Sequence, residues 1–254
     1  MSLGHSRRPF AAKSGSSRTT ASLVFARQRD GHILKEIVNH REDFMPMIIP
    51  TTLADWLSAD RTALLVYDMQ IGIARQVKGS EDTVRHIAQI VAAARNAGIR
   101  IAFCRHLSLP KPWMGLFATR MAMAWQRTDD PGKVRPWFLR DTEAVSIVPE
   151  LRPQEQDFVF DKLGMSAFEG TPLELALRDA GLSSLAICGI AMEIGIEPTC
   201  RHAADLGIVP ILIEDACGHG DAEAAKQSVD TLRFHGDTVV TNRDEFISAI
   251  SRRI

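Results

Sequence analysis

Residues 184–207 read Ser-Leu-Ala-Ile-Cys-Gly-Ile-Ala-Met-Glu-Ile-Gly-Ile-Glu-Pro-Thr-Cys-Arg-His-Ala-Ala-Asp-Leu-Gly, and this stretch decides the fold. The apolar run over 184–188 has the length and composition of a buried strand. Gly189 then permits a tight turn, and residues 194–206 continue as a helix that Gly207 ends. A strand that passes through a tight turn into a helix is the repeating unit of α/β proteins.

The same alternation runs along most of the chain. Because strands that alternate with helices form parallel sheets with right-handed crossovers, we expect a three-layer α/β/α sandwich around a mostly parallel, Rossmann-like sheet. No Gly-x-Gly-x-x-Gly motif follows a strand, so no dinucleotide cofactor is expected. Strands are predicted at 62–67, 100–104, 157–160, 184–188, 209–213 and 238–240, and helices at 80–97, 171–180, 194–206, 222–234 and 243–250.

Composition narrows the class of protein. The 254 residues are 45% hydrophobic and 24% charged with a formal net charge of −1, so no basic face for nucleic acid is expected. No apolar run is long enough to cross a bilayer, and no membrane partner is expected. The cysteines are widely spaced without a Cys-x-x-Cys pair, which favours reduced thiols in a cytoplasmic protein. They are Cys104, Cys188, Cys200 and Cys217.

Two segments interrupt the pattern. Residues 1–50 are treated as an N-terminal extension, flexible or packed on a neighbouring subunit, although the basic, serine-rich start also resembles a transit peptide. Residues 107–150 contain no clear strand and are interpreted as a lid or a subunit contact. The arginines in or beside this segment bind an anionic substrate or are solvated, and the tryptophans serve the lid or an oligomer contact. They are Arg105, Arg120, Arg127, Arg135, Arg140, Trp113, Trp125 and Trp137.

Three features fall at the carboxyl ends of separate predicted strands. Asp68 follows the first strand, Lys162 lies two residues past the third, and the turn at Gly189 follows the fourth. Each alone has an ordinary structural explanation, such as a turn or a solvated side chain. Because ligands of open parallel sheets bind beyond these strand ends, the three together predict one shared crevice.

The local sequences resemble those of the isochorismatase-like cysteine hydrolases over about residues 60–250. Asp68 stands in an Asp-x-Gln context with Gln70, and Lys162 precedes the run Ser-Ala-Phe-Glu-Gly-Thr at 166–171. The resemblance implies an isochorismatase-like hydrolase domain at 51–254 that acts on a small molecule as a homodimer or homotetramer without a cofactor. It also implies a cis Ile190–Ala191 bond.

By this resemblance, Gly195 stands where most of the family carries the catalytic cysteine, and the N–H groups of Ala191 and Gly195 form an oxyanion hole. Some isochorismatases have glycine there and use the aspartate as a general acid. Asp68 and Lys162 are therefore the predicted catalytic pair. The family's metal-using members carry Asp-x-His where this chain has Cys104-Arg105-His106, so no metal is expected. The predicted substrate-binding residues are Gln70, Arg105, Phe168 and Glu193.

Three functions remain open at this point. The first is an isochorismatase-like hydrolase that uses Asp68 and Lys162 without a cysteine nucleophile. The second is a catalytically inactive relative that binds a small molecule or a partner. The third is a C–N amidohydrolase whose catalytic cysteine was changed to Gly195. Cys104 is the nearest alternative thiol, whereas Cys200 is expected to face the packing side of its helix.

Overall fold

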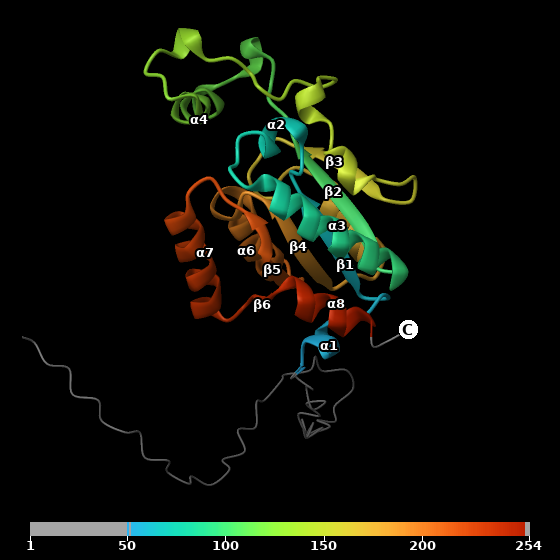
Figure 1. Ribbon diagram of the computed structural model, residues 1–254. Helices are drawn as coiled ribbons and strands as arrows, with labels where there is room; N and C mark the ends of the chain where they lie inside the picture. The colour runs from blue at the N-terminus through green and yellow to red at the C-terminus, as the bar shows by residue number, and fades with distance from the viewer. Residues whose placement is uncertain (1–49, 51, 252–254) are drawn as a thin grey trace, which may run out of the picture. The chain divides into compact units, whose positions relative to one another are not determined.

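The computed structural model describes residue 50 and residues 52–251, and the predicted N-terminal extension lies almost entirely outside them. In this part of the chain, six parallel strands form one sheet in the order β3-β2-β1-β4-β5-β6 (Figure 1). The predicted parallel sheet is therefore confirmed. The strands are β1 (Thr62–Tyr67), β2 (Arg100–His106), β3 (Phe158–Lys162), β4 (Ser184–Ile190), β5 (Val209–Gly218) and β6 (Val239–Thr241).

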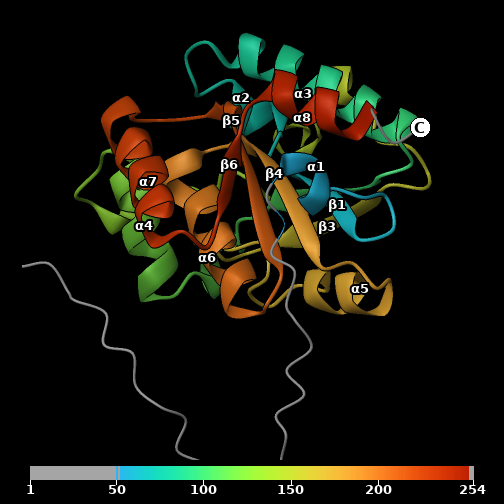
Figure 2. The same cartoon turned by 90° about the horizontal axis from the view of Figure 1, so that it is seen from below.

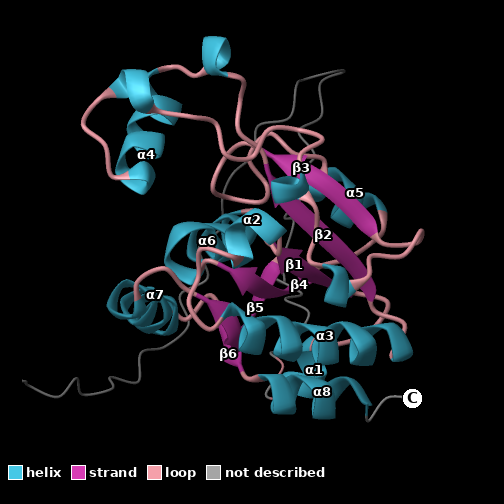
Figure 3. Ribbon diagram, turned by 45° about the horizontal axis from the view of Figure 1, so that its top comes forward, coloured by secondary structure: helices cyan, strands magenta, loops and turns pink. Residues whose placement is uncertain are grey.

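Helices cover both faces of the sheet (Figures 2 and 3). The side chains of β1 alternate between two cores, because successive residues of a strand point to opposite faces. Leu64 and Val66 pack on the side of α3, whereas Leu65 and Tyr67 pack on the side of α6. One layer contains α1 (Leu53–Trp56), α3 (Ser80–Asn96) and α8 (Arg243–Ser251), and the other contains α5 (Leu173–Asp179), α6 (Glu197–Asp205) and α7 (Ala222–His235).

The segment between β2 and β3 contains no strand in the structure, as predicted, but it does contain a helix. Helix α4 (Leu116–Gln126) and several short 3-10 turns lie beyond the carboxyl ends of β2 and β3 (Figure 1). A further short helix, α2 (Ile71–Ala74), follows β1. Both helices escaped prediction, since α2 is only four residues long and α4 has no buried face that would set a 3.6-residue apolar period.

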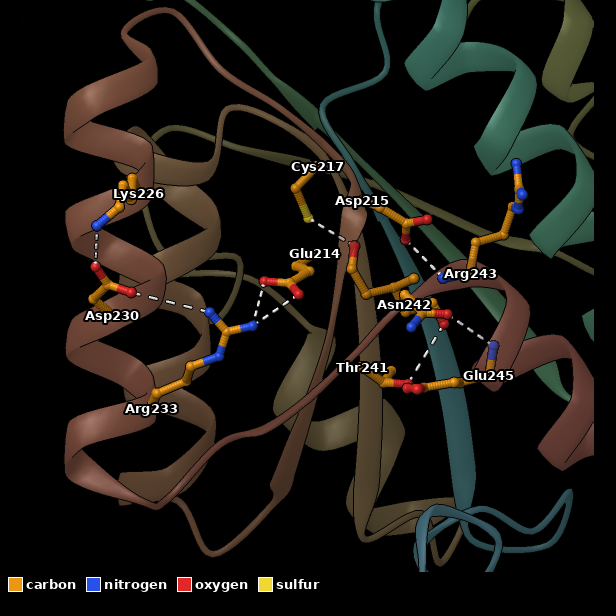
Figure 4. A network of polar contacts seen from close by, with 11 residues as sticks. Glu214, Asp215, Cys217, Lys226, Asp230, Arg233, Thr241, Asn242, Arg243 and Glu245 are labelled. Atoms are coloured by element: carbon orange, nitrogen blue, oxygen red, sulfur yellow. Dashed lines mark hydrogen bonds and ion pairs between the residues drawn. The ribbon is translucent and has the colours of Figure 1, made fainter.

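Polar contacts hold α7 and α8 against β5 (Figure 4). Arg233 of α7 pairs with Glu214 of β5 at 2.7 Å, and Asp215 accepts a 2.7 Å hydrogen bond from the backbone N–H of Arg243, the first residue of α8. β5 continues to Gly218, beyond the predicted end at residue 213, because Glu214 and Asp215 interrupt the apolar run on which the prediction was based.

The order of the strands determines where a ligand can bind. The chain moves outward from β1 through β2 to β3, then returns to β4 on the other side of β1. Such a reversal leaves a crevice at the carboxyl ends of the two central strands. Asp68 follows β1, and the turn at Gly189 to Ala191 lies at the end of β4, so both predicted features border this crevice. No helix within the described residues is long and apolar enough to span a membrane.

Candidate active site

A buried ion pair lies at the crevice. Lys162, the last residue of β3, reaches across β2 and places Nζ 2.8 Å from Oδ2 of Asp68. The two residues are only 3% and 5% exposed. Lys162 Nζ also donates to the backbone oxygen of Gly164 at 3.1 Å. The structure thus brings together the two side chains that were predicted to be catalytic, in an environment that is largely shielded from solvent.

A thiol donates a hydrogen bond to the other oxygen of the Asp68 carboxylate. Cys104 Sγ donates to Asp68 Oδ1 at 3.4 Å. Burial raises the pKa of the Asp68 carboxyl, while the charge and hydrogen bond of Lys162 and the bond from Cys104 oppose this shift. Burial and the neighbouring Asp68 raise the pKa of the Cys104 thiol well above its usual value. Cys104 is therefore a neutral donor at neutral pH, and the Asp68 carboxyl keeps a proton to higher pH than an exposed aspartic acid does.

Tyr67 fills the space beside Gly195. A Cβ built on Gly195 would lie 2.8 Å from Tyr67 Cε1 and closer still to Cζ and Oη, well inside van der Waals contact. The Tyr67 hydroxyl donates to the backbone oxygen of Met165, and Lys162 Nζ lies 4.4 Å from the centre of its ring. Residue 195 therefore has no room for any side chain while Tyr67 stays in this position.

The turn between β4 and α6 has the expected cis peptide bond between Ile190 and Ala191. Gly189 precedes it with φ of 139°, and a Cβ there would lie 2.7 Å from the backbone nitrogen of Tyr67, so only glycine fits. The following residues, Met192–Ile196, form a single π turn. The N–H of Gly195 donates to the Ala191 carbonyl at 3.1 Å, so in this structure the predicted oxyanion donor is engaged within the backbone.

The Gln70 side chain joins two strand ends by hydrogen bonds. Its amide nitrogen donates to the backbone oxygen of His106 at 3.0 Å, and its amide oxygen accepts from the His106 N–H at 2.6 Å. The side chain is fully buried, so it joins the segment after β1 to the end of β2. In this position Gln70 supports the site and does not reach a pocket.

The other predicted substrate-binding residues contact partners other than Asp68 and Lys162. Arg105 pairs with Asp161 at 2.8 Å, and Phe168 is a buried core residue whose ring contacts His202. Glu193 accepts hydrogen bonds from two backbone N–H groups in the loop before α7, at 2.8 and 3.0 Å. The structure thus gives each of these three side chains a partner within the fold.

A pocket of about 250 Å³ opens next to the site, between α4 and the ends of β2 and β3. Most of its lining is apolar and aromatic, including Phe117, Trp125 and Phe138, and His106 and Gly164 form the part nearest the ion pair. Nδ1 of His106 is buried without a hydrogen-bond partner. Burial and the charge of Lys162 lower the pKa of His106 to about 3, which keeps its ring neutral.

The described residues offer neither a metal site nor an exposed nucleophile at Cys188 or Cys200. Within residues 50 and 52–251, no group of three or more His, Cys, Asp or Glu side chains is arranged to hold a metal ion. Cys188 and Cys200 are fully buried in the two cores, and burial raises the pKa of each thiol. Cys200 faces the packing side of α6, as predicted from its position on the helix.

Tyr67 is the site residue that the sequence analysis missed. It is the only tyrosine among the 254 residues, and it stands in a strand that is otherwise small or aliphatic, directly before Asp68. The bulky Tyr67 side chain fills the space that a side chain at position 195 would need, and Gly195 leaves that space free. This complementarity can be recognised only when the end of β1 and the turn after β4 are known to face each other.

Comparison with known proteins agrees with the fold. The isochorismatase domain family matches residues 62–244. The chain is 30% identical to the uncharacterized isochorismatase family protein YecD of Escherichia coli O157:H7, over 69% of this chain and 89% of that protein. It is 27% identical to the ureidoacrylate amidohydrolase RutB of Variovorax paradoxus (strain S110), over 77% and 83%. The crystal structure of a cysteine hydrolase from Pseudomonas syringae pv. phaseolicola 1448A superimposes with a TM-score of 0.68 at 25% identity, covering 78% of this chain and 96% of that one.

Proposed function

This chain belongs to the isochorismatase family, and from that premise we propose that it hydrolyses a small molecule with Asp68 and Lys162 and without a cysteine nucleophile. The observation that carries the proposal is the buried Asp68–Lys162 pair, 2.8 Å apart, beside a Gly195 whose side-chain space is filled by Tyr67.

In the proposed reaction, Asp68 acts as a general acid. Burial raises the pKa of its carboxyl, which increases the fraction that carries a proton when substrate arrives. The protonated carboxyl donates its proton to the leaving atom of the substrate, and the Lys162 ammonium stabilises the carboxylate that this leaves. A water molecule attacks the adjacent carbon as the bond to the leaving atom breaks, and the proton that the water loses returns to the Asp68 carboxylate. The pocket under α4 adjoins this pair through His106 and Gly164 and is our candidate substrate site.

Two features argue against covalent catalysis by a thiol. A cysteine at position 195 would overlap the Tyr67 ring, which speaks against a site that merely lost its sulfur. Cys104 is the thiol nearest to Asp68, but it is 1% exposed and its pKa is raised well above the usual value, so little reactive thiolate forms at neutral pH.

A substrate panel of small amides and enol ethers tests the proposal. We expect turnover by the wild type to survive iodoacetamide and to be lost in Asp68→Asn. The matched control is Asp230→Asn, which changes an exposed carboxylate that also pairs with a lysine at 2.6 Å. Circular dichroism verifies that each variant is folded. Loss of activity on alkylation, with the label mapped to Cys104, would replace this mechanism with a thiol mechanism.

A second candidate is a non-catalytic relative that binds a small metabolite. The observation that favours it is the burial of Asp68 and Lys162, neither of which lines the pocket. This candidate predicts a rise in melting temperature with a pocket ligand but no product. Detection of product from the same ligand, absent in Asp68→Asn, decides against it.

We also propose that the protein acts in the cytoplasm as a homodimer or homotetramer. Around α4, the large apolar side chains Trp113, Leu116 and Phe117 are 76%, 78% and 68% exposed, and a subunit contact would remove them from water. Light scattering coupled to size exclusion gives the mass. A monomer at micromolar concentration contradicts this part of the proposal.

A further inference from the structure

Gly195 and Tyr67 compete for one volume. Tyr67 is 2% exposed, and a Cβ on Gly195 would lie 2.8 Å from Cε1 of its ring and still nearer its hydroxyl. Ordinary non-bonded carbons lie about 3.5–4.0 Å apart. Both residues are held by backbone contacts: Gly195 sits within the π turn, and the Tyr67 hydroxyl is bonded to Met165. Neither can retreat without breaking such a contact.

The same ring contacts the ion pair. Lys162 Nζ lies 4.4 Å from the ring centre while it bonds Asp68 and Gly164. A cation above an aromatic face is attracted by the ring electrons, and the attraction is larger where water is excluded. The Tyr67 ring therefore covers one side of the Lys162 ammonium, and its hydroxyl hydrogen-bonds to Met165 in the segment that follows β3.

We propose that Tyr67 is a positioning residue that takes the place of a side chain at position 195 and holds Lys162 against Asp68. The steric part of this inference stands on geometry alone, whereas the positioning part rests on the proposed function. The phenol itself is no nucleophile. Burial and the neighbouring Asp68 raise its pKa well above the usual value, and its proton is already donated to Met165.

A thermal double-mutant cycle tests the steric part with Gly195→Ala, Tyr67→Leu and both together. Alanine normally stabilises a helical position relative to glycine. Overpacking reverses the sign here, so we expect Gly195→Ala to lower the melting temperature by about 4–10 °C in the wild type. In the Tyr67→Leu background the same change should be neutral or raise it.

The control is Gly115→Ala, because a Cβ at Gly115 meets nothing within 4 Å and its φ is negative. If Tyr67→Leu does not fold, Tyr67→Phe serves in its place. It removes the nearest atom, Oη, and should reduce the penalty of Gly195→Ala. Equal effects of Gly195→Ala in all backgrounds, or a higher melting temperature in the wild type, would overturn the pairing.

A thiol gives a second readout that does not require turnover. In Tyr67→Leu/Gly195→Cys, we expect the introduced thiol at position 195 to react with iodoacetamide at neutral pH at least about tenfold faster than the four native thiols, because it would occupy the volume of the Tyr67 ring, 4.4 Å from whose centre the Lys162 ammonium lies, and a nearby cation favours the thiolate. A label on residue 195 that forms no faster than on Cys217 contradicts the inference.

The pH profile tests positioning. With Lys162 less well held in Tyr67→Leu, the pKa of Asp68 should rise, so the fall in kcat at high pH should move to higher pH than in Gly115→Ala. An unmoved profile refutes the positioning role. If the cycle shows coupling but wild type turns over no substrate, the steric pairing holds and the proposed function fails.

Discussion

Replacing Lys162 with methionine should reveal how much the fold depends on its buried charge. Methionine has a similar length and apolar character but no ammonium, so Asp68 would lose its 2.8 Å partner inside a site that is 5% exposed. Removing one member of a buried ion pair typically costs about 3–5 kcal/mol, because the other charge remains without solvent or partner. With a urea dependence of about 2–3 kcal/mol per molar, the unfolding midpoint should fall by about 1–2.5 M.

The effect should depend on pH with a definite sign. The pKa of folded Asp68 is raised above its unfolded value near 3.8, and the loss of Lys162 raises it further. An acid whose folded pKa is raised loses stability as the pH increases through the interval between the two values, by up to about 1.4 kcal/mol per pH unit. The destabilisation by Lys162→Met should therefore be largest at pH 8 and should shrink as the pH approaches 4.

Urea unfolding followed by fluorescence at pH 8 and pH 5 measures both quantities. The double variant Asp68→Asn/Lys162→Met carries neither charge and should recover much of the stability. Lys226→Met is the control, because this exposed lysine pairs with Asp230 on the surface of α7 and should leave the midpoint nearly unchanged (Figure 4). The reasoning fails if Lys162→Met costs less than about 1 kcal/mol or costs the same at both pH values.

Two further predictions concern neighbouring residues. Because the pKa of His106 is lowered to about 3, wild type should lose stability relative to His106→Gln as the pH falls below 6.5, by about 2 kcal/mol at pH 5. Urea unfolding of both proteins at pH 7.5 and pH 5 measures this, and an equal difference in unfolding free energy at the two pH values would contradict it. Gly189→Ala should lower the melting temperature more than Gly207→Ala does, because a Cβ at residue 189 would overlap the Tyr67 backbone, whereas one at residue 207 meets open space. Similar melting temperatures for the two variants would disprove the close approach of Gly189 to Tyr67.

The sheet and the positions of the paired charges were accessible from the sequence. Apolar runs of strand length followed by helical periodicity are strong local signals; Asp68 directly follows one such strand, and Lys162 is the last residue of another. The cis bond at Ile190–Ala191 was expected from family resemblance, not from local chemistry. The parallel sheet, the proximity of Asp68 and Lys162 and the cis bond therefore agree with the structure.

The parts that depend on contacts between distant residues could not be read in this way. The apolar pattern did not predict the end of β5, because the strand contains Glu214 and Asp215, whose partners lie on α7 and α8. The place of Tyr67 beside Gly195 joins residues 128 positions apart. Gln70 resembled a substrate ligand because its bond to His106 exists only once β1 and β2 are adjacent.

The strand order also has a consequence for how the protein is made. β1 is synthesised before β4, one of its two neighbours in the sheet, which ends at Ile190. The edge of β1 that pairs with β4 stays open until residue 190 has been made, and such long-range pairing is slow to form. Nascent chains that stall before residue 190 therefore cannot build the crevice, and they present an apolar strand edge that chaperones are suited to cover.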